Sequence, residues 1–236
     1  MERPNVANDP ERTSRRLLSR IADGGGDGPA RETLRRFDPD RLEAALDGPD
    51  VRTAFWLNVY NAFSQLLLSE YDGQSVDEGL FDVPFAFART ELSLNDVEHA
   101  ILRNGDPSGL AYEPTAPAAF TARFRVGRTD PRIHFALNCG ARSCPPIRWY
   151  TSESLERELE CASEQYLSSA VEYDATTGTV SVPELFEWFA PDFGGESGVV
   201  SFLRSYGAVP DAADPRLEYR EWDWTVVAGN VACGDA

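Results

Sequence analysis

The chain contains two histidines, His99 and His134, and both lie in segments that carry other reactive side chains. His99 directly follows Glu98, and His134 stands shortly before Cys139. A cysteine becomes a good nucleophile near neutral pH only when its pKa falls below the usual value of about 8.5, and histidine is the common base that activates it. These residues therefore predict a cysteine-dependent site with Cys139 as nucleophile, either histidine as base and Glu98 as the acid.

The segment around Cys139 suits such a site because it follows an apolar stretch, residues 132–137, that we expect to be a strand. Gly140 can adopt a positive φ angle and turn backbone N–H groups toward a substrate oxyanion. Cys144 follows closely, which leaves three alternatives: one nucleophile and a spectator, a redox pair, or two metal ligands completed by a histidine. The spacing is not C-x-x-C, which argues against zinc-ribbon and thioredoxin-like sites.

Each of these side chains also has a structural interpretation. His134 can be a core residue with satisfied hydrogen bonds, and His99 can lie on a helix surface. Glu98 falls on the apolar side of a predicted helix, and a buried carboxylate needs a partner. Either Arg142 or Arg148 neutralises it, or it orients a histidine as the acid of a catalytic triad does.

A polar stripe interrupts the most apolar part of the chain. Asn58, Asn61 and Gln65 recur at helical spacing in a long helix that we predict from Asp50 to about Tyr71, beside Trp56. Buried amides need hydrogen-bond partners, so they either hold loop backbone or line the site and polarise a substrate carbonyl. The sequence supports both alternatives.

The elements that must position these residues follow one another irregularly. The predicted helices are 10–22, 30–37, 39–46, 50–71, about 94–103, 152–167, 183–189 and 198–206, and the predicted strands are 84–89, 91–94, 118–126, 132–137, a hairpin around 176–178, and 219–227. This order predicts an α+β fold in a single domain, with a mixed or antiparallel sheet packed against the long central helix. We expect a helical lead-in at 1–49, the main domain at 50–228 and a tail at 229–236.

The composition excludes several function classes. The chain has 236 residues, and 39 Asp and Glu against 22 basic residues, all of them arginine, give a net charge of −17. An acidic surface without lysine is typical of proteins that work in molar salt, so we expect a halophilic, cytoplasmic protein. The lack of a basic stripe argues against a nucleic-acid partner and against an anionic membrane surface.

The sequence shows neither a signal segment nor a stretch of about 20 apolar residues that could span a membrane. The four cysteines are too few for a disulfide scaffold, so in a reducing cytosol we expect free thiols. We assign no chemistry to Cys161 and Cys233.

Three blocks of the sequence resemble, in the same order, the domain-of-unknown-function family 547. They are FWLNVYNA (55–62), LSLNDVEHAILR (92–103) and HFALNCGARSCPP (134–146). The resemblance covers roughly residues 38–226, and no activity is established for that family. It implies that the functional positions are Trp56, Asn58, Asn61, Glu98, His99, His134 and Cys139. Because serine replaces Cys144 in some relatives, the resemblance favours Cys139 as the chemical residue.

Relatives that join this domain to a glutaredoxin module indicate thiol chemistry. The inventory of cysteine, histidine and acid is also similar to that of papain-like cysteine hydrolases and transglutaminases, so a papain-like fold is a further expectation. In those families the cysteine usually precedes the histidine, whereas here both histidines come first, so only a permuted or independent arrangement fits.

We therefore expect a cysteine-dependent hydrolase or acyltransferase that acts on a small molecule or peptide, with no cofactor and no metal. Cys139, His99, His134 and Glu98 are the predicted catalytic residues. The predicted supporting residues are Asn58, Asn61, Trp56, Cys144 and Arg142. The alternatives are a non-catalytic binding or scaffold domain with a buried polar network, and a thiol redox or metal site.

Overall fold

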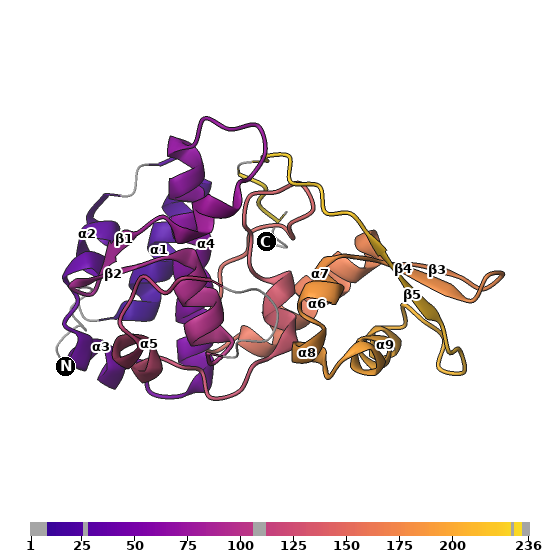
Figure 1. Cartoon of the computed structure of the whole chain (residues 1–236). Coiled ribbons are helices and arrows are strands. Elements are labelled where there is room, and N and C mark those ends of the chain that lie inside the picture. Colours follow the sequence, from indigo (N-terminus) through magenta and orange to yellow (C-terminus); the bar gives the residue numbers. More distant parts are fainter. Residues whose placement is uncertain (1–8, 26–27, 106–111, 228, 233–236) are drawn as a thin grey trace.

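Helix α4 (Pro49–Glu70) is the long apolar helix that the sequence predicts, and it lies at the centre of the N-terminal half of the molecule (Figure 1). Helix α1 (Pro10–Ala22) packs along it and buries Leu17 completely. Residues on every side of α4 are buried between positions 53 and 65. A helix buried all round needs neighbours on all faces, and the remaining elements supply them.

The computed structural model describes residues 9–25, 28–105, 112–227 and 229–232. The other α-helices within these ranges are α2 (Gly28–Arg36), α3 (Pro39–Ala45), α5 (Ala118–Arg123), α6 (Leu155–Ala170), α7 (Leu185–Trp188), α8 (Ala190–Phe193) and α9 (Glu196–Ser205). Two short 3-10 helices, η2 (Glu78–Asp82) and η4 (Pro131–Phe135), and a π-helix, η3 (Asp96–Leu102), lie between them. The strands are β1 (Phe85–Phe87), β2 (Thr90–Leu92), β3 (Glu172–Asp174), β4 (Thr179–Pro183) and β5 (Arg216–Arg220).

The antiparallel pair β1 and β2 packs its aromatic side chains on α4. The Phe85 ring stacks on Phe63 with ring centroids 3.9 Å apart, and the Phe87 ring lies 5.1 Å from that of Trp56. Aromatic pairs at such distances stabilise a core beyond the area they bury. The small sheet thereby closes one side of the long helix, as the sequence predicts for an antiparallel sheet.

A second sheet lies at the opposite end of the molecule (Figure 1). Strand β4 pairs antiparallel with β3 and parallel with β5, so this sheet is mixed. The predicted hairpin around residues 176–178 is confirmed as the turn between β3 and β4. Val180 and Val182 of β4 belong to a second apolar cluster with α6, α7 and α9. The chain is therefore a single α+β domain with two small sheets.

Two predicted strands are wrong. Residues 118–126 form helix α5 and a following loop, and residues 132–137 form most of η4. Each helix begins at or just after a proline, Pro117 or Pro131, whose fixed φ angle favours a first helical turn. Asp130 also caps η4 by accepting a hydrogen bond from the backbone N–H of Arg132 at 2.9 Å. These local signals outweigh the apolar, β-branched composition.

The last predicted strand, 219–227, lies too far along the chain. Strand β5 ends at Arg220, and the next residues form single antiparallel bridges, Ser75 with Thr225 and Ala141 with Val226. The first bridge ties this segment to Ser75. The second bridge, with the backbone hydrogen bonds from Arg142 to Thr225 and from Ser143 to Asp223, ties it to the loop that follows Cys139. The chain near its C-terminus thereby becomes a wall of the cavity described below.

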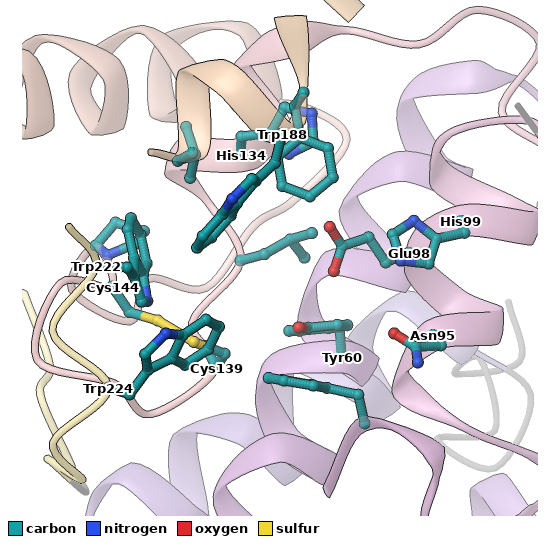
Figure 2. Close-up of a pocket in the computed structure, with 15 residues that line it drawn as sticks. Tyr60, Asn95, Glu98, His99, His134, Cys139, Cys144, Trp188, Trp222 and Trp224 are labelled. Carbon is teal, nitrogen blue, oxygen red and sulfur yellow. A yellow bond between two sulfur atoms is a disulfide. The ribbon is translucent and has the colours of Figure 1, made fainter. Parts of the chain in front are cut away.

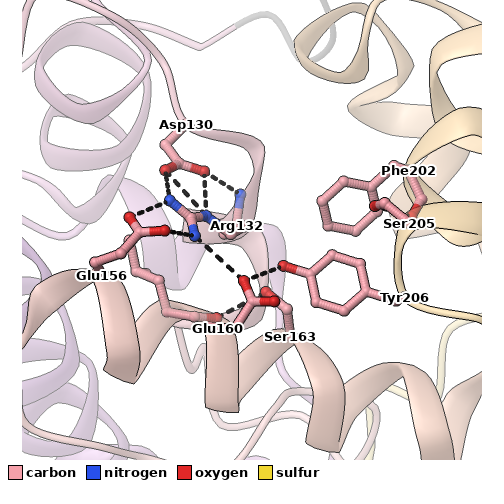
Figure 3. Close-up of polar contacts among 9 residues, drawn as sticks. Asp130, Arg132, Glu156, Glu160, Ser163, Phe202, Ser205 and Tyr206 are labelled. Carbon is pink, nitrogen blue, oxygen red and sulfur yellow. Dashed lines mark hydrogen bonds and ion pairs between the residues drawn. The ribbon is translucent and has the colours of Figure 1, made fainter.

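The guanidinium group of Arg132 fixes η4, and with it His134, to the neighbouring helices (Figure 3). It binds Asp130 and Glu156 at 2.6 to 3.1 Å and reaches Glu160 at 3.4 Å. Tyr206 of α9 donates to Glu160 at 2.7 Å, so one network joins η4, α6 and α9. The hydrogen bonds that Arg132 donates to Glu156 and Asp130 raise the pKa of its guanidinium group, which remains charged.

Candidate functional site

A cavity of about 90 Å³ brings together the four residues predicted to be catalytic (Figure 2). Glu98, His99, His134 and Cys139 all line it, together with Cys144. The elements that contribute them are η3, η4 and the loop after η4. The cavity joins segments far apart in sequence, as a functional site usually does.

The π-helix η3 explains how two consecutive residues, Glu98 and His99, reach the same cavity. It begins after a capping box in which the Ser93 hydroxyl accepts from the N–H of Asp96 and the Asp96 carboxylate accepts from the N–H of Ser93. The wider turn of a π-helix changes which residues share a face, so a wheel drawn at 3.6 residues per turn misplaces them. His99 is 3 % exposed, contrary to the helix-surface alternative.

A buried ion pair lies directly behind the cavity. The guanidinium group of Arg103 donates to both carboxylate oxygens of Asp192, at 2.6 and 3.1 Å, and both side chains are 1 % exposed or less. The Nε2 atom of His134 lies 2.8 Å from the same carboxylate. Burial raises the pKa of Asp192, but the hydrogen bonds from His134 and Arg103 outweigh it and bring the pKa to about 2.

Asp192, and not Glu98, is therefore the acid that orients His134. The ring of His134 also stacks on Phe189, with centroids 4.0 Å apart. A histidine held by a carboxylate at one nitrogen and by an aromatic face has a fixed orientation. No pattern in the sequence singles out Asp192, because its partner His134 stands 58 residues earlier in the chain.

His99 is held as a neutral side chain. Its Nδ1 atom lies 3.0 Å from a guanidinium nitrogen of Arg103. Burial, followed by the positive charge of Arg103, lowers the pKa of His99 to about 4. Because an arginine nitrogen can only donate, Nδ1 accepts and the remaining proton sits on Nε2.

Glu98 directs its carboxyl group toward the middle of the cavity (Figure 2). Tyr60 of α4 donates a hydrogen bond to it. Burial raises the pKa of Glu98, although the charges of His134 and Arg103 and the tyrosine bond act in the opposite direction. The predicted partners are wrong: Arg142 pairs with Asp223 and Arg148 with Glu158.

Cys139 and Cys144 form a disulfide bond, which corrects the expectation of free thiols for these two residues. Their Cα atoms lie 6.3 Å apart, within the range that a disulfide spans. Gly140 takes a φ of 86°, as predicted, and its position against Leu68 leaves no room for a Cβ atom. The turn at Gly140 brings the two cysteines together. Cys161 is free, and Cys233 lies outside the described residues.

Three backbone N–H groups that follow Cys139 are already bound. Gly140 donates to the side-chain oxygen of Asn138 at 2.9 Å, Arg142 to the carbonyl of Thr225 at 2.8 Å and Ser143 to the carbonyl of Asp223 at 3.2 Å. An oxyanion hole needs donors that point at the substrate oxygen. These three donors hold loop structure instead.

The amides of Asn58 and Asn61 hold loop backbone. Asn58 exchanges two hydrogen bonds with the backbone of Tyr150, at 2.8 and 2.9 Å. Asn61 donates to the carbonyl of Ala136 at 2.9 Å and accepts from the N–H of Asn138 at 2.8 Å. These contacts join α4 to the loops on either side of the disulfide. Of the two alternatives that the sequence left open, they match the first.

Replacing Asn61 with alanine should lower the free energy of unfolding by about 2 kcal/mol, because two buried backbone groups lose their partner. Urea denaturation measures this change. An alanine at Ser69, an exposed residue near the end of α4 whose hydroxyl bonds within the helix, is the control and should change stability by less than about 0.5 kcal/mol. Equal effects of the two substitutions would contradict the structural role of Asn61.

Two predicted supporting residues lie away from the cavity. Trp56 is fully buried in the aromatic core beside Phe55 and Phe87. Arg142 has 62 % of its side chain exposed and pairs with Asp223 at 3.1 Å. The predicted catalytic residues and Cys144 therefore line one cavity, whereas Trp56 and Arg142 lie outside it.

The aromatic wall of the cavity was not predicted from the sequence. Trp188, Trp222 and Trp224 line it opposite Glu98, and Tyr60 and Asn95 lie on the side of Glu98 (Figure 2). The sequence shows Trp222 and Trp224 close together, but it does not show that Trp188 joins them. Arg103 stands four residues after His99, a helical spacing that could have identified the pair.

Among the described residues, no group of three or more His, Cys, Asp and Glu side chains is arranged to hold a metal ion. No helix in the described part of the chain is long and apolar enough to cross a membrane.

Comparison with known proteins identifies a family. The family model described as "Protein of unknown function, DUF547" matches residues 35–167, which include the long helix, η3 and the disulfide loop. No curated protein and no solved structure matches the chain. The matched region ends before Trp188, Asp192 and Trp222, so the place of these three residues at the site is known from the structure and not from the family model.

Proposed function

Because the chain belongs to the DUF547 family of proteins of unknown function, we propose from its own geometry that it is a thiol–disulfide oxidoreductase whose reacting pair is Cys139 and Cys144. One observation carries the proposal: the disulfide forms part of the wall of the cavity. A structural disulfide is more often enclosed, whereas a catalytic one must be reached by a second thiol.

The two sulfur atoms have different surroundings, which suits an exchange reaction. Cys139 is partly exposed, whereas Cys144 is 6 % exposed. The backbone N–H of Cys139 donates to the Sγ atom of Cys144 at 3.2 Å. A hydrogen bond of this kind stabilises a thiolate, so Cys144 is the better leaving group and Cys139 the sulfur that is attacked.

The reaction proceeds in two exchanges. A substrate thiolate attacks Sγ of Cys139, forms a mixed disulfide and expels Cys144 as a thiolate. A second substrate thiolate then attacks the substrate sulfur of the mixed disulfide, which yields the substrate disulfide and releases Cys139 as a thiolate. Two electrons pass from the two substrate thiols to the protein, and an oxidised disulfide partner restores the starting state by the reverse steps. Glu98, with its raised pKa, can exchange protons in the same cavity.

Trapping the mixed disulfide tests the proposal. Reduced Cys144→Ser protein, treated with oxidised glutathione, should accumulate a glutathione adduct on Cys139, because the second sulfur that would release it is absent. Cys139→Ser is the matched control and should form little adduct, because the remaining Cys144 is buried. Both variants carry Cys161→Ser and Cys233→Ser, and mass spectrometry locates the adduct. Equal labelling of the two variants, or none in either, would argue against the proposal.

A cysteine-dependent hydrolase or acyltransferase is the second candidate, and the hydrogen-bonded pair of His134 and Asp192 at the same cavity favours it. In that case the reduced protein would acylate Cys139 with an activated ester and then hydrolyse the adduct. Turnover of the ester by the reduced wild type, lost in Cys139→Ala and retained in Cys144→Ser, would support this candidate over disulfide exchange.

A further inference from the structure

Three tryptophan rings form one continuous aromatic wall in the cavity (Figure 2). The ring centroid of Trp188 lies 5.5 Å from that of Trp222 and 5.7 Å from that of Trp224, and the last two are 6.1 Å apart. Trp188 and Trp224 are only partly buried, so part of their surface remains free for a ligand. Disulfide exchange needs no such wall, and the function proposed above leaves it unexplained.

A carboxyl group stands opposite this wall. Glu98 points into the cavity from the other side, beside Tyr60 and Asn95 (Figure 2). No arginine lines the cavity among the described residues. The nearest one, Arg103, lies behind His99 and is bound to Asp192. Glu98 is therefore the one acidic side chain among the described lining residues; burial raises its pKa, so the negative charge that it offers a ligand develops above that raised pKa and is stabilised by a bound cation.

The histidines add little positive charge to this surface. His99, whose pKa is lowered to about 4 by burial and by Arg103, is neutral at pH 7. His134 is bonded to the carboxylate of Asp192, which offsets a proton on its ring. Aromatic faces attract cations through the negative potential above the ring, and tryptophan does so most strongly. An aromatic wall facing a carboxylate is complementary to a positive charge.

We propose that this cavity binds the methylated ammonium group of a small molecule or of a modified side chain. Methyl groups fit an apolar, aromatic surface, and a quaternary ammonium group needs no hydrogen-bond acceptor, whereas a primary ammonium group needs three. The cavity, with a volume of about 90 Å³, has room for one small group. The net charge of −17 attracts cations toward the protein.

The aromatic wall also contains an unpaired polar atom. The indole N–H of Trp222 is buried and has no hydrogen-bond partner among the described residues. A buried donor without a partner is unusual in a protein. This binding property does not depend on whether the disulfide exchanges.

Choline and its neutral analogue 3,3-dimethyl-1-butanol test the inference, because they have the same shape and differ in charge. Intrinsic tryptophan fluorescence and isothermal titration calorimetry, at constant ionic strength and slightly alkaline pH, measure both. Choline should bind saturably and about tenfold more tightly than the neutral analogue. Equal affinity for the two, or no saturable binding of choline, would overturn the inference.

Variants show where the ligand binds. Glu98→Gln and Trp188→Leu should each weaken choline binding by about tenfold. Trp149→Leu is the matched control, since this tryptophan is 42 % exposed and does not line the cavity, and it should bind choline as the wild type does. Unchanged binding in Glu98→Gln, with a wild-type thermal midpoint, would contradict the assignment.

Choline titration of the oxidised wild-type protein, without any added thiol, separates this inference from the proposed function, because disulfide exchange cannot occur without a thiol. Saturable choline binding under these conditions, together with a failed trapping experiment, would leave the cation site standing and reject the redox function. A successful trapping experiment without saturable choline binding would reject the cation site and leave the redox function standing.

Discussion

Arg103→Met should lower the free energy of unfolding by about 3–5 kcal/mol, which is the usual effect of removing one partner of a buried ion pair. The substitution leaves the carboxylate of Asp192, of which 1 % of the side chain is exposed, with only His134 to balance its charge. It also removes the group that holds His99. Urea denaturation at neutral pH measures the change.

Arg157→Met is the matched control, because this arginine is 74 % exposed and its ion pair with Glu158 is at the surface. Its loss should change stability by less than about 0.5 kcal/mol. The double substitution Arg103→Met with Asp192→Leu removes both charges and should recover part of the lost stability. An Arg103→Met protein as stable as the Arg157→Met protein would contradict the role of this buried pair.

As the pH falls from 6.5 to about 4, the wild-type protein should lose the stability that arises from the lowered pKa of His99. His99 has a pKa of about 4 in the folded protein against 6.5 when unfolded, so the unfolded chain binds the extra proton first. The stabilisation is complete above pH 6.5 and is lost below about pH 4. The shift corresponds to about 3 kcal/mol across this window.

His99→Gln should remove this dependence, and the test is the difference between its pH profile and that of the wild type in urea denaturation. The comparison is needed because Glu98, whose pKa is raised by burial, acts with the opposite sign: the folded protein holds its proton more tightly, so stability falls as the pH rises through that pKa. Parallel profiles for the wild type and His99→Gln would show that His99 is not held neutral by burial.

Sequence patterns predicted the elements that carry strong local signals. The apolar run that became α4 has too many aromatic and aliphatic residues for a surface helix, and Gly48 and Pro49 mark its start. The hairpin between β3 and β4 has a Thr-Thr-Gly turn, with Gly178 at a φ of 67°. In both cases the information lies within a few residues, and tertiary contacts only reinforce it.

Other elements were mispredicted because an apolar composition concealed local helix signals and because contacts distant in sequence complete their conformation. Residues 132–137 have the composition of a strand, but Pro131 and the cap at Asp130 start the 3-10 helix Pro131–Phe135, and the Arg132 network across α6 and α9 holds it. No single-sequence signal marks η3 as a π-helix rather than an α-helix. Both Glu98 and His99 line the cavity from this π-helix.

For the site, the clustering of rare residues was the useful signal. It singled out Glu98, His99, His134 and Cys139, and the structure places all four around one cavity. Their catalytic roles stay a prediction. Asp192 could not be identified from the sequence, because an acidic residue at this position could pair with any of several arginines. The disulfide was one of three alternatives, and spacing alone could not choose among them.

The most direct test of the account is a redox titration of the cysteines. The protein is equilibrated in glutathione buffers of increasing oxidation, alkylated, and analysed by mass spectrometry for each cysteine. We expect Cys139 and Cys144 to lose reactivity together in one two-electron transition, while Cys161 stays free throughout. If Cys139 and Cys144 remain alkylated independently of each other in the most oxidising buffer, no disulfide forms between them and the redox function is wrong.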